Sequence, residues 1–166
     1  MGVELETERL KLRQFREADT DPLLAFYRDS VSESVYGPAM ARSDVWKRIA
    51  AILGHWQLRG YGRWAIEEKS SGAFAGYCGL SFTPEFADIE VGYGIMPAYR
   101  GKGIATEAAR CAKDYGYRQV GAARIVSYIN PVNASSIRVA QKLQALPDGA
   151  FILNDIPHTV YLHQKS

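Results

Sequence analysis

A glycine-rich loop between a strand-like run and a helix-like run is the feature that most restricts how this chain can fold. Residues 87–96 are typical of a strand that stops at Pro97, and after the loop apolar residues recur at helical spacing. The loop reads Arg100-Gly101-Lys102-Gly103-Ile104-Ala105. A helix N-terminus carries about four unpaired N–H groups and a partial positive charge, and glycines let these groups approach an anion closely. The pattern predicts a phosphate-binding loop on an α/β scaffold.

The charge distribution supports this interpretation. Residues 100–142 hold eight basic and two acidic residues, a net charge of +6, although the whole chain, with 20 basic and 18 acidic residues, has a net charge of only +2. The small total gives no reason to expect a general attraction to nucleic acid or to a membrane, whereas the local surplus suits a polyanionic cofactor. The alternative is an ordinary turn beside a solvated charged face. We disfavour it because strand, loop, helix and charge all coincide.

Other nucleotide-binding motifs fit less well. The P-loop pattern Gly-x-x-x-x-Gly-Lys-Ser/Thr is absent. A nicotinamide oxidoreductase would need a third glycine where Thr106 stands, and an acidic residue for the ribose, but there is no Asp or Glu between Asp114 and Asp148. The three histidines lie far apart without ligand spacing, and two cysteines make no metal knuckle, so we expect no metal.

The remaining patterns predict a single α/β domain over residues 1–166. Seven strands are expected, at residues 10–15, 63–67, 74–82, 87–96, 124–128, 151–153 and 159–162, the last two joined by residues 154–157. Four helices are expected: the first capped by Asp19 or Asp21, the second capped by Ser43 or Asp44 and ended by Gly60 and Gly62, the third after Gly101, and the fourth capped by Asn133.

The N-terminal residues alternate charged and apolar types and lack the apolar core of a signal peptide. Met-Gly at the start is followed by Glu6 where a myristoylation motif needs Ser or Thr. No window approaches the roughly 20 apolar residues of a membrane span. The expectation is a soluble, cytoplasmic protein that acts as a monomer or homodimer.

Three sequence blocks resemble the GNAT superfamily of N-acetyltransferases, in the branch of the RimJ and RimL ribosomal-protein acetyltransferases. They are Thr7 to Arg13, Gly92-Tyr93 through Arg100 to Ala108, and Pro131 to Ser136. Arg100, Gly103 and Ala105 match the superfamily signature Arg/Gln-x-x-Gly-x-Gly/Ala. The loop alone is moderately specific, whereas three blocks in the right order over nearly the whole chain are strongly so.

The resemblance implies a three-layer α/β (α+β) fold whose mixed, mostly antiparallel sheet has two neighbouring strands that splay apart around acetyl-CoA. It implies that the backbone of Ile95 and Met96 meets the pantetheine arm. It implies that the loop holds the pyrophosphate, through Arg100, Gly101, Lys102, Gly103, Ile104, Ala105 and Thr106. Asn133 and Ser136 are then expected near the pantetheine or the sulfur.

Three positions depart from the family pattern. Ala140 stands where many members carry the tyrosine that protonates the departing thiolate, seven residues after the asparagine. Lys142 to Pro147 replaces the usual Lys-Leu-Gly-Phe and could rearrange the acceptor end. Gly94 replaces an apolar residue after Tyr93, which could widen a strand bulge.

The implied reaction is direct attack of a primary amine on the thioester. Glu90, in the strand before the loop, is the candidate base, and its structural alternative is an ion pair with an arginine. Ser136 is the candidate acid, with a helix cap as its alternative, and Tyr128 is a weaker candidate. The acceptor cleft could be walled by aromatic residues, although core packing is the commoner use of such residues: Tyr36, Trp56, Tyr61 and Trp64.

We expect a protein or peptide N-terminal amine as acceptor. A small-molecule amine (an aminoglycoside, a polyamine or an amino acid) stays open, as does a non-catalytic acetyl-CoA-binding protein.

Overall fold

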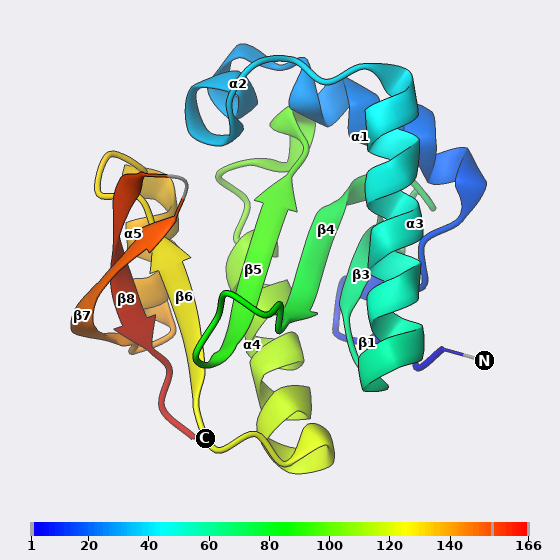
Figure 1. The fold of residues 1–166 in the computed structure, drawn as a ribbon. Helices are drawn as coiled ribbons and strands as arrows, with labels where there is room; N and C mark the ends of the chain where they lie inside the picture. The colour runs from blue at the N-terminus through cyan, green and yellow to red at the C-terminus, as the bar shows by residue number, and fades with distance from the viewer. Residues whose placement is uncertain (1, 154, 166) are drawn as a thin grey trace.

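The computed structural model describes residues 2–153 and 155–165. Its strands are β1 (Leu5–Glu6), β2 (Leu10–Arg13), β3 (Arg63–Glu68), β4 (Phe74–Ser81), β5 (Ile89–Ile95), β6 (Ile125–Ile129), β7 (Leu146–Leu153) and β8 (Ile156–Leu162). Its helices are α1 (Thr20–Tyr27), α2 (Ser30–Tyr36), α3 (Arg42–Arg59), α4 (Ile104–Tyr115) and α5 (Ala134–Lys142). The strands form one sheet in the order β1-β2-β3-β4-β5-β6-β8-β7. The expected mixed α/β sheet is confirmed (Figure 1).

Helices cover both faces of the sheet, as the alternation of side chains along the strands requires. In β3, Trp64 and Ile66 pack in the cluster that contains α4, whereas Ala65 between them packs in the cluster of α1 and α3. Figure 1 shows α3 in front of the sheet with α4 and α5 behind it. The molecule therefore has three layers, with an apolar core on each face of the sheet.

The sheet is antiparallel except between β5 and β6, which run parallel. These two strands pair only at Ile89 with Ile125 and at Glu90 with Val126, although β5 continues to Ile95 and β6 to Ile129. Beyond these pairs the strands diverge, as Figure 1 shows. The divergence confirms the expected splayed pair and leaves one edge of β5 open.

Several local predictions are confirmed. Gly60 ends α3 with a left-handed φ of 75°, and Asn133 caps α5 by accepting a hydrogen bond from the backbone N–H of Ser136. The predicted cap of the second helix is wrong. Helix α3 begins at Arg42, before Ser43 and Asp44, with Ala41 as its N-cap.

Asp19 does occupy the N-cap position of α1, but its carboxylate makes no cap hydrogen bond there. It binds Arg13 and the backbone of Arg16 instead.

Four elements differ from the sequence prediction. The two-residue β1 is too short to show a period, and the seven-residue α2 offers only one apolar pair at helical spacing, Val31 and Val35, which is too little to indicate a helix. Strand β7 begins at Leu146, five residues before the predicted strand, because the Pro-Asp-Gly run that follows reads as a turn. Strand β8 already includes Ile156 and Pro157, predicted as connection, while Asn154 in that predicted turn lies outside the described residues. Within the described part of the chain no helix is long and apolar enough to cross a membrane.

Candidate functional site

Two cavities meet at the opening between β5 and β6. The first encloses about 300 Å³ beside the start of α4, and the second encloses about 540 Å³ on the side of β3, β4 and α3. Five residues line both cavities: Val35, Tyr36, Tyr93, Asn133 and Ser136. A molecule in each cavity would therefore meet the other at the splay.

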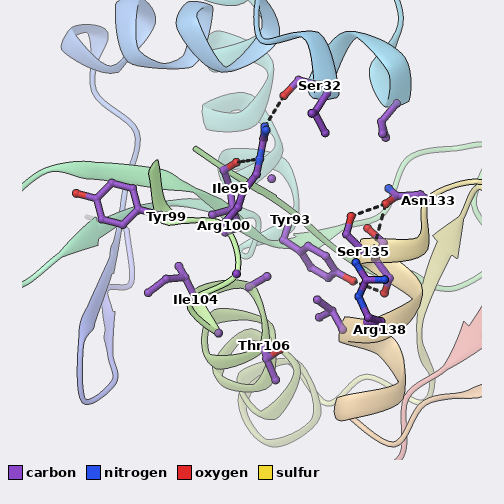
Figure 2. Close-up of a pocket in the computed structure, with 18 of the residues that line it drawn as sticks. Ser32, Tyr93, Ile95, Tyr99, Arg100, Ile104, Thr106, Asn133, Ser135 and Arg138 are labelled. Carbon is purple, nitrogen blue, oxygen red and sulfur yellow. Dashed lines mark hydrogen bonds between the residues drawn. The ribbon is translucent and has the colours of Figure 1, made fainter. Parts of the chain in front are cut away.

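The glycine loop forms one wall of the first cavity. Gly101 and Gly103 have φ angles of 74° and 80°, a left-handed conformation that favours glycine, and Gly103 is the N-cap of α4. No side chain caps this helix start, so its first N–H groups are left for a ligand. Gly101, Gly103, Ile104, Ala105 and Thr106 all line the cavity, which is the arrangement that an anion needs (Figure 2).

The N-terminal sequence block supports this loop from outside. Glu107, in the first turn of α4, accepts hydrogen bonds from Thr7 and Arg9, and Arg9 also donates to the carbonyl of Lys102 at 3.0 Å. Burial alone would raise the pKa of Glu107, but the hydrogen bonds from Thr7 and Arg9 outweigh it and hold that pKa below its ordinary value. Glu107 is therefore ionised. Through it, the N-terminal block that contains Thr7 and Arg9 is bound to the glycine loop and the start of α4.

Arg100 lines the first cavity but its guanidinium is already engaged. It donates to Asp29 at 2.7 Å, to Ser32 at 3.0 Å and to the carbonyl of Ile95 at 3.1 Å (Figure 2). In this arrangement the residue ties the loop to the start of α2. Arg100 is thus placed to position α2 over the site as well as to face a phosphate.

Ile95 and Met96, the two residues whose backbone was expected to meet the pantetheine arm, face opposite edges of β5. The N–H of Met96 donates to the carbonyl of Ala75 on β4, so Met96 faces the paired side of the strand. Backbone groups alternate along a strand, so Ile95 faces the opening, and it also lines the first cavity. The structure brings Ile95 to the site and turns Met96 toward the packing of α1 and α3.

Asn133 and Ser136 lie on the far side of the opening, at the start of α5. Asn133 Oδ1 accepts from the N–H of Ser136 at 3.1 Å, and the Ser136 carbonyl accepts from the hydroxyl of Tyr93 at 3.2 Å. Burial raises the pKa of Tyr93, so its hydroxyl stays protonated and holds β5 to α5 across the gap (Figure 2). Tyr93 is a site residue that the sequence did not predict, because a Gly-Tyr pair in a strand indicates no particular role.

The basic residues of the segment are only partly gathered at the site. Arg138 and Lys142 line the first cavity, whereas Arg124 pairs with Asp88 and Asp148 away from it. Lys102 places its ammonium over the ring of Tyr99 and does not line the cavity. Sequence charge alone could not separate these groups, because the face of a helix that a cavity borders is set by tertiary packing.

Glu90 lies on the wall of the second cavity and makes the ion pair that was its structural alternative. Its carboxylate contacts Arg63 at 2.7 Å, and its side chain is 14% exposed. Burial alone would lower the pKa of Arg63, but the Glu90 carboxylate raises it above its usual value. Arg63 therefore stays protonated, with Glu90 as its ion-pair partner.

The aromatic walls of the second cavity differ from those expected. Tyr36 lines it, but Tyr61 and Trp64 are buried in the core and Trp56 packs against that core. Tyr128 also lines the cavity, stacked at 4.6 Å between Phe86 and Phe151. The other aromatic residues on the wall are Tyr27, Tyr77, Phe86 and Tyr93. Residue types alone do not reveal which aromatic faces a cavity and which faces the core.

A buried hydroxyl–imidazole pair closes the apex of the splay. Ser127 Oγ donates to the carbonyl of Val91 at 2.7 Å and lies 2.9 Å from His163 Nε2. Because the only hydroxyl proton is used on Val91, His163 Nε2 must carry the proton that Ser127 accepts. Burial, with Lys113 nearby, lowers the pKa of His163 to about 4, so the ring is neutral at pH 7. The contact of Ser127 with Val91 therefore joins β6 to β5 near the point where their pairing ends.

Two departures from the family pattern have structural answers. The register between β4 and β5 is regular through Gly94, so the expected bulge is wrong; a side chain there would meet the rings of Tyr77 and Phe26 within 3 Å. In the segment from Lys142 to Pro147, only Lys142 lines either cavity, and Gln144 takes a left-handed φ of 58° before β7. The segment forms the connection into β7 and contributes no residue to the wall of the second cavity.

Ala140 does not face either cavity. It is 0% exposed and packs against Ile129, Ala145 and Tyr161. We expect Ala140→Tyr to overpack this cluster and destabilise the fold by about 1–3 kcal/mol, without a gain in turnover. Denaturant unfolding would measure the loss, with Gln141→Tyr on the exposed face of α5 as the control. A stable variant with faster turnover would contradict this packing argument.

Among residues 2–153 and 155–165, no group of three or more His, Cys, Asp or Glu side chains is arranged to hold a metal ion. The donors around the first cavity are instead backbone N–H groups and cations. Such a donor set fits a phosphate-bearing ligand.

Comparison with known proteins identifies the family. A GNAT acetyltransferase domain model matches residues 9–145. YkkB of Bacillus subtilis, a protein described as uncharacterized, is 31% identical over 150 residues, which are 85% of this chain and 84% of YkkB. An uncharacterized N-acetyltransferase of Bacillus licheniformis, p20, is 28% identical over 148 residues, covering 87% and 83% of the two chains.

Solved structures agree. An acetyltransferase from Agrobacterium tumefaciens superposes with a TM-score of 0.90 at 26% identity, over 99% of this chain and 96% of that one. RimL, a ribosomal alpha-N-protein acetyltransferase, gives 0.79 at 18% identity, over 98% and 93%. An aminoglycoside acetyltransferase in complex with coenzyme A gives 0.75 at 18% identity, over 93% and 94%. The last two likenesses show the fold alone.

The chain belongs to the GNAT acetyltransferase family, and the site is that of an acetyl-CoA-dependent N-acetyltransferase. The likeness to RimL, at 18% identity, bears on the fold and does not test the RimJ/RimL-like branch expected from the three sequence blocks.

Proposed function

We propose that acetyl-CoA lies in the first cavity, that the amine lies in the second, and that they react where the cavities meet. The observation that carries this proposal is the set of residues common to both walls, with Tyr93 on β5 and Ser136 on α5 facing each other across the splay. Holding two reactants at such a junction lowers the barrier, because the entropy of bringing them together is already lost on binding.

The loop residues have separate roles in this proposal. The loop glycines Gly101 and Gly103 and the first N–H groups of α4, from Ile104 to Thr106 through Ala105, hold the pyrophosphate. Lys102, whose ammonium lies over the ring of Tyr99, supplies only the backbone between the two glycines. Arg138 and Lys142 add charge on the same wall, and Arg100 orders α2 above it. Ile95 offers its backbone at the open edge of β5, with Met96 as the strand's anchor to β4.

The chemical step needs one proton removed and one supplied. The amine nitrogen forms a bond to the thioester carbon, the carbon–sulfur bond breaks, and the thiolate takes a proton. Ser136 borders both cavities, and its backbone, not its hydroxyl, makes the cap contact with Asn133, so the hydroxyl is placed to donate. Glu90 is our proposed base through water, and it keeps its ion pair with Arg63 at 2.7 Å.

The acceptor follows from amine chemistry. A lysine side chain has a pKa near 10.4, whereas an α-amine lies near 7.7–8.0, so at pH 7 a far larger fraction of the α-amine is neutral. A site with one ion-paired carboxylate as base gains more from an amine that is already neutral. We therefore place a peptide or protein α-amine first and a small-molecule amine second.

The test offers short peptides that each contain one lysine, with a free or blocked N-terminus, and locates the acetyl group by mass spectrometry. We expect acetylation of the free N-terminus and little or none of the blocked peptide. Modification confined to lysine would contradict the ranking while leaving the acetyl-CoA site intact. Turnover with any amine excludes a non-catalytic acetyl-CoA-binding protein, which is the remaining alternative.

A further inference from the structure

The charged residues on the wall of the second cavity restrict which amine acceptors can bind there. Among the described residues that line it, the arginines are Arg48 and Arg63 and the only acidic residue is Glu90. Arg63 and Glu90 neutralise each other through their 2.7 Å contact. Arg48 remains as a charge that the cavity itself does not balance.

Arg48 comes from the middle of α3 and is half-buried. Its guanidinium lies over the ring of Tyr27, 5.2 Å from the centroid. Within the part of the chain that the structure describes, it makes neither an ion pair nor a hydrogen bond, although a guanidinium carries five N–H donors in a planar fork. The ring of Tyr27 holds the Arg48 guanidinium in place, and the guanidinium N–H groups remain free to bind a ligand.

The groups beside Arg48 add polarity to this wall but no second unbalanced charge. Arg63 Nε is buried with no hydrogen-bond partner among the described residues, and its guanidinium lies 5.8 Å from the ring centroid of Tyr77. Burial raises the pKa of both Tyr27 and Tyr77, so their hydroxyls remain protonated, and these hydroxyls are engaged with one another and with Tyr36. The charge that this end of the cavity offers to an anion is therefore that of Arg48.

From these contacts we infer that the amine acceptor carries a carboxylate and that Arg48 binds it. The inference rests on the proposed function and narrows its acceptor class. Arg48 and the residues at the splay, Tyr93 and Ser136, line the same cavity, so one molecule can present its carboxylate to α3 and its amine to the thioester. An arginine fork suits a carboxylate because it can bind both oxygens.

The same charges disfavour polycationic acceptors. A polyamine or an aminoglycoside would bring several positive charges against Arg48, with only the already paired Glu90 to receive them. Free amino acids, peptides with a free C-terminus and peptides with an acidic residue near the N-terminus all satisfy the requirement.

The test is a pool of amines in matched forms. Each amino acid and dipeptide is offered as the carboxylate and as the carboxamide, and each short peptide with Glu or with Gln at its second position, alongside spermidine and an aminoglycoside. Product is measured by mass spectrometry with acetyl-CoA in excess. We expect the carboxylate forms to be acetylated at least about 10-fold more efficiently than their neutral partners.

Variants of α3 assign the effect to one side chain. Arg48→Gln should raise KM for the carboxylate form about 10-fold or more, and should leave both KM for the neutral form and acetyl-CoA affinity unchanged. Arg48→Lys, which keeps the charge without the fork, should fall between. Arg59→Gln is the matched control, because Arg59 lies on the same helix 4.9 Å from the ring centroid of Phe82 but does not line the cavity.

Equal efficiency for carboxylate and carboxamide, or a preference for spermidine or the aminoglycoside, would overturn the inference and leave the proposed function standing. An Arg48→Gln variant that keeps the wild-type preference would do so as well. If calorimetry detects acetyl-CoA binding but no amine in the pool is acetylated, the carboxylate inference fails. If acetyl-CoA itself does not bind, the proposed function fails with it.

Discussion

Gly103→Glu should weaken acetyl-CoA binding about 100-fold or more while the protein stays folded. Gly103 is the N-cap of α4 and lines the first cavity, so a carboxylate there faces the pyrophosphate that the loop is proposed to hold. The affected N–H donors are charge-assisted partners of the ligand, and each is worth roughly 1.5–3 kcal/mol, so losing even one accounts for most of the effect. Calorimetric titration with acetyl-CoA measures the change.

A control substitution at Gly121 distinguishes the effect of a carboxylate in the site from the effect of backbone strain. Gly121 has a φ of 74°, close to the 80° of Gly103, and a side chain there would meet nothing within 4 Å. Gly121→Glu carries the same strain, about 1–2 kcal/mol, but lies outside both cavities, so acetyl-CoA affinity should not change. Gly103→Lys should lose less affinity than Gly103→Glu. Equal affinity of Gly103→Glu and wild type would remove the loop from the site.

The sequence predicted the conformation of the glycine loop well, because that conformation depends on neighbouring residues alone. Two glycines at left-handed φ before a helix need only neighbouring residues, and those residues are printed side by side. The splayed strands were expected from a family resemblance that three separate blocks carried. The structure adds why the first block matters: Thr7 and Arg9 hold Glu107 beneath the loop.

The acceptor side was predicted poorly because its determinants are distant in sequence. Arg48 contacts Tyr27, and Glu90 contacts Arg63, across separations that no periodicity reveals. Trp64 resembles a cleft residue by type but is fully buried, with its indole N–H bound to the carbonyl of Val3. Cavity walls depend on which face of each element is left uncovered, and tertiary packing alone decides that.

Asp19→Ala should cost about 3–5 kcal/mol of stability, the largest loss that we expect from a single truncation outside the site. Asp19 and Arg13 are only 4% and 5% exposed, and two guanidinium nitrogens contact the two carboxylate oxygens at 2.9 Å. Arg13 also binds Glu67, and Asp19 accepts from the backbone N–H of Arg16 at 2.7 Å. Truncation removes the bidentate anion of a buried guanidinium, which keeps only Glu67 as an anionic partner, and it removes the acceptor of the turn before α1.

The control is a second aspartate–arginine pair that differs in burial. Asp21 contacts Arg42 at 2.7 Å, but their side chains are 70% and 62% exposed, so Asp21→Ala should cost less than about 1 kcal/mol. Denaturant unfolding of the two variants gives the comparison directly. Because α1 carries Phe26 and Tyr27 to the two cavities, Asp19→Ala should also lower acetyl-transfer activity at temperatures where Asp21→Ala does not. Similar stability losses in the two variants would show that burial of the Arg13 pair is not what anchors α1 to the sheet.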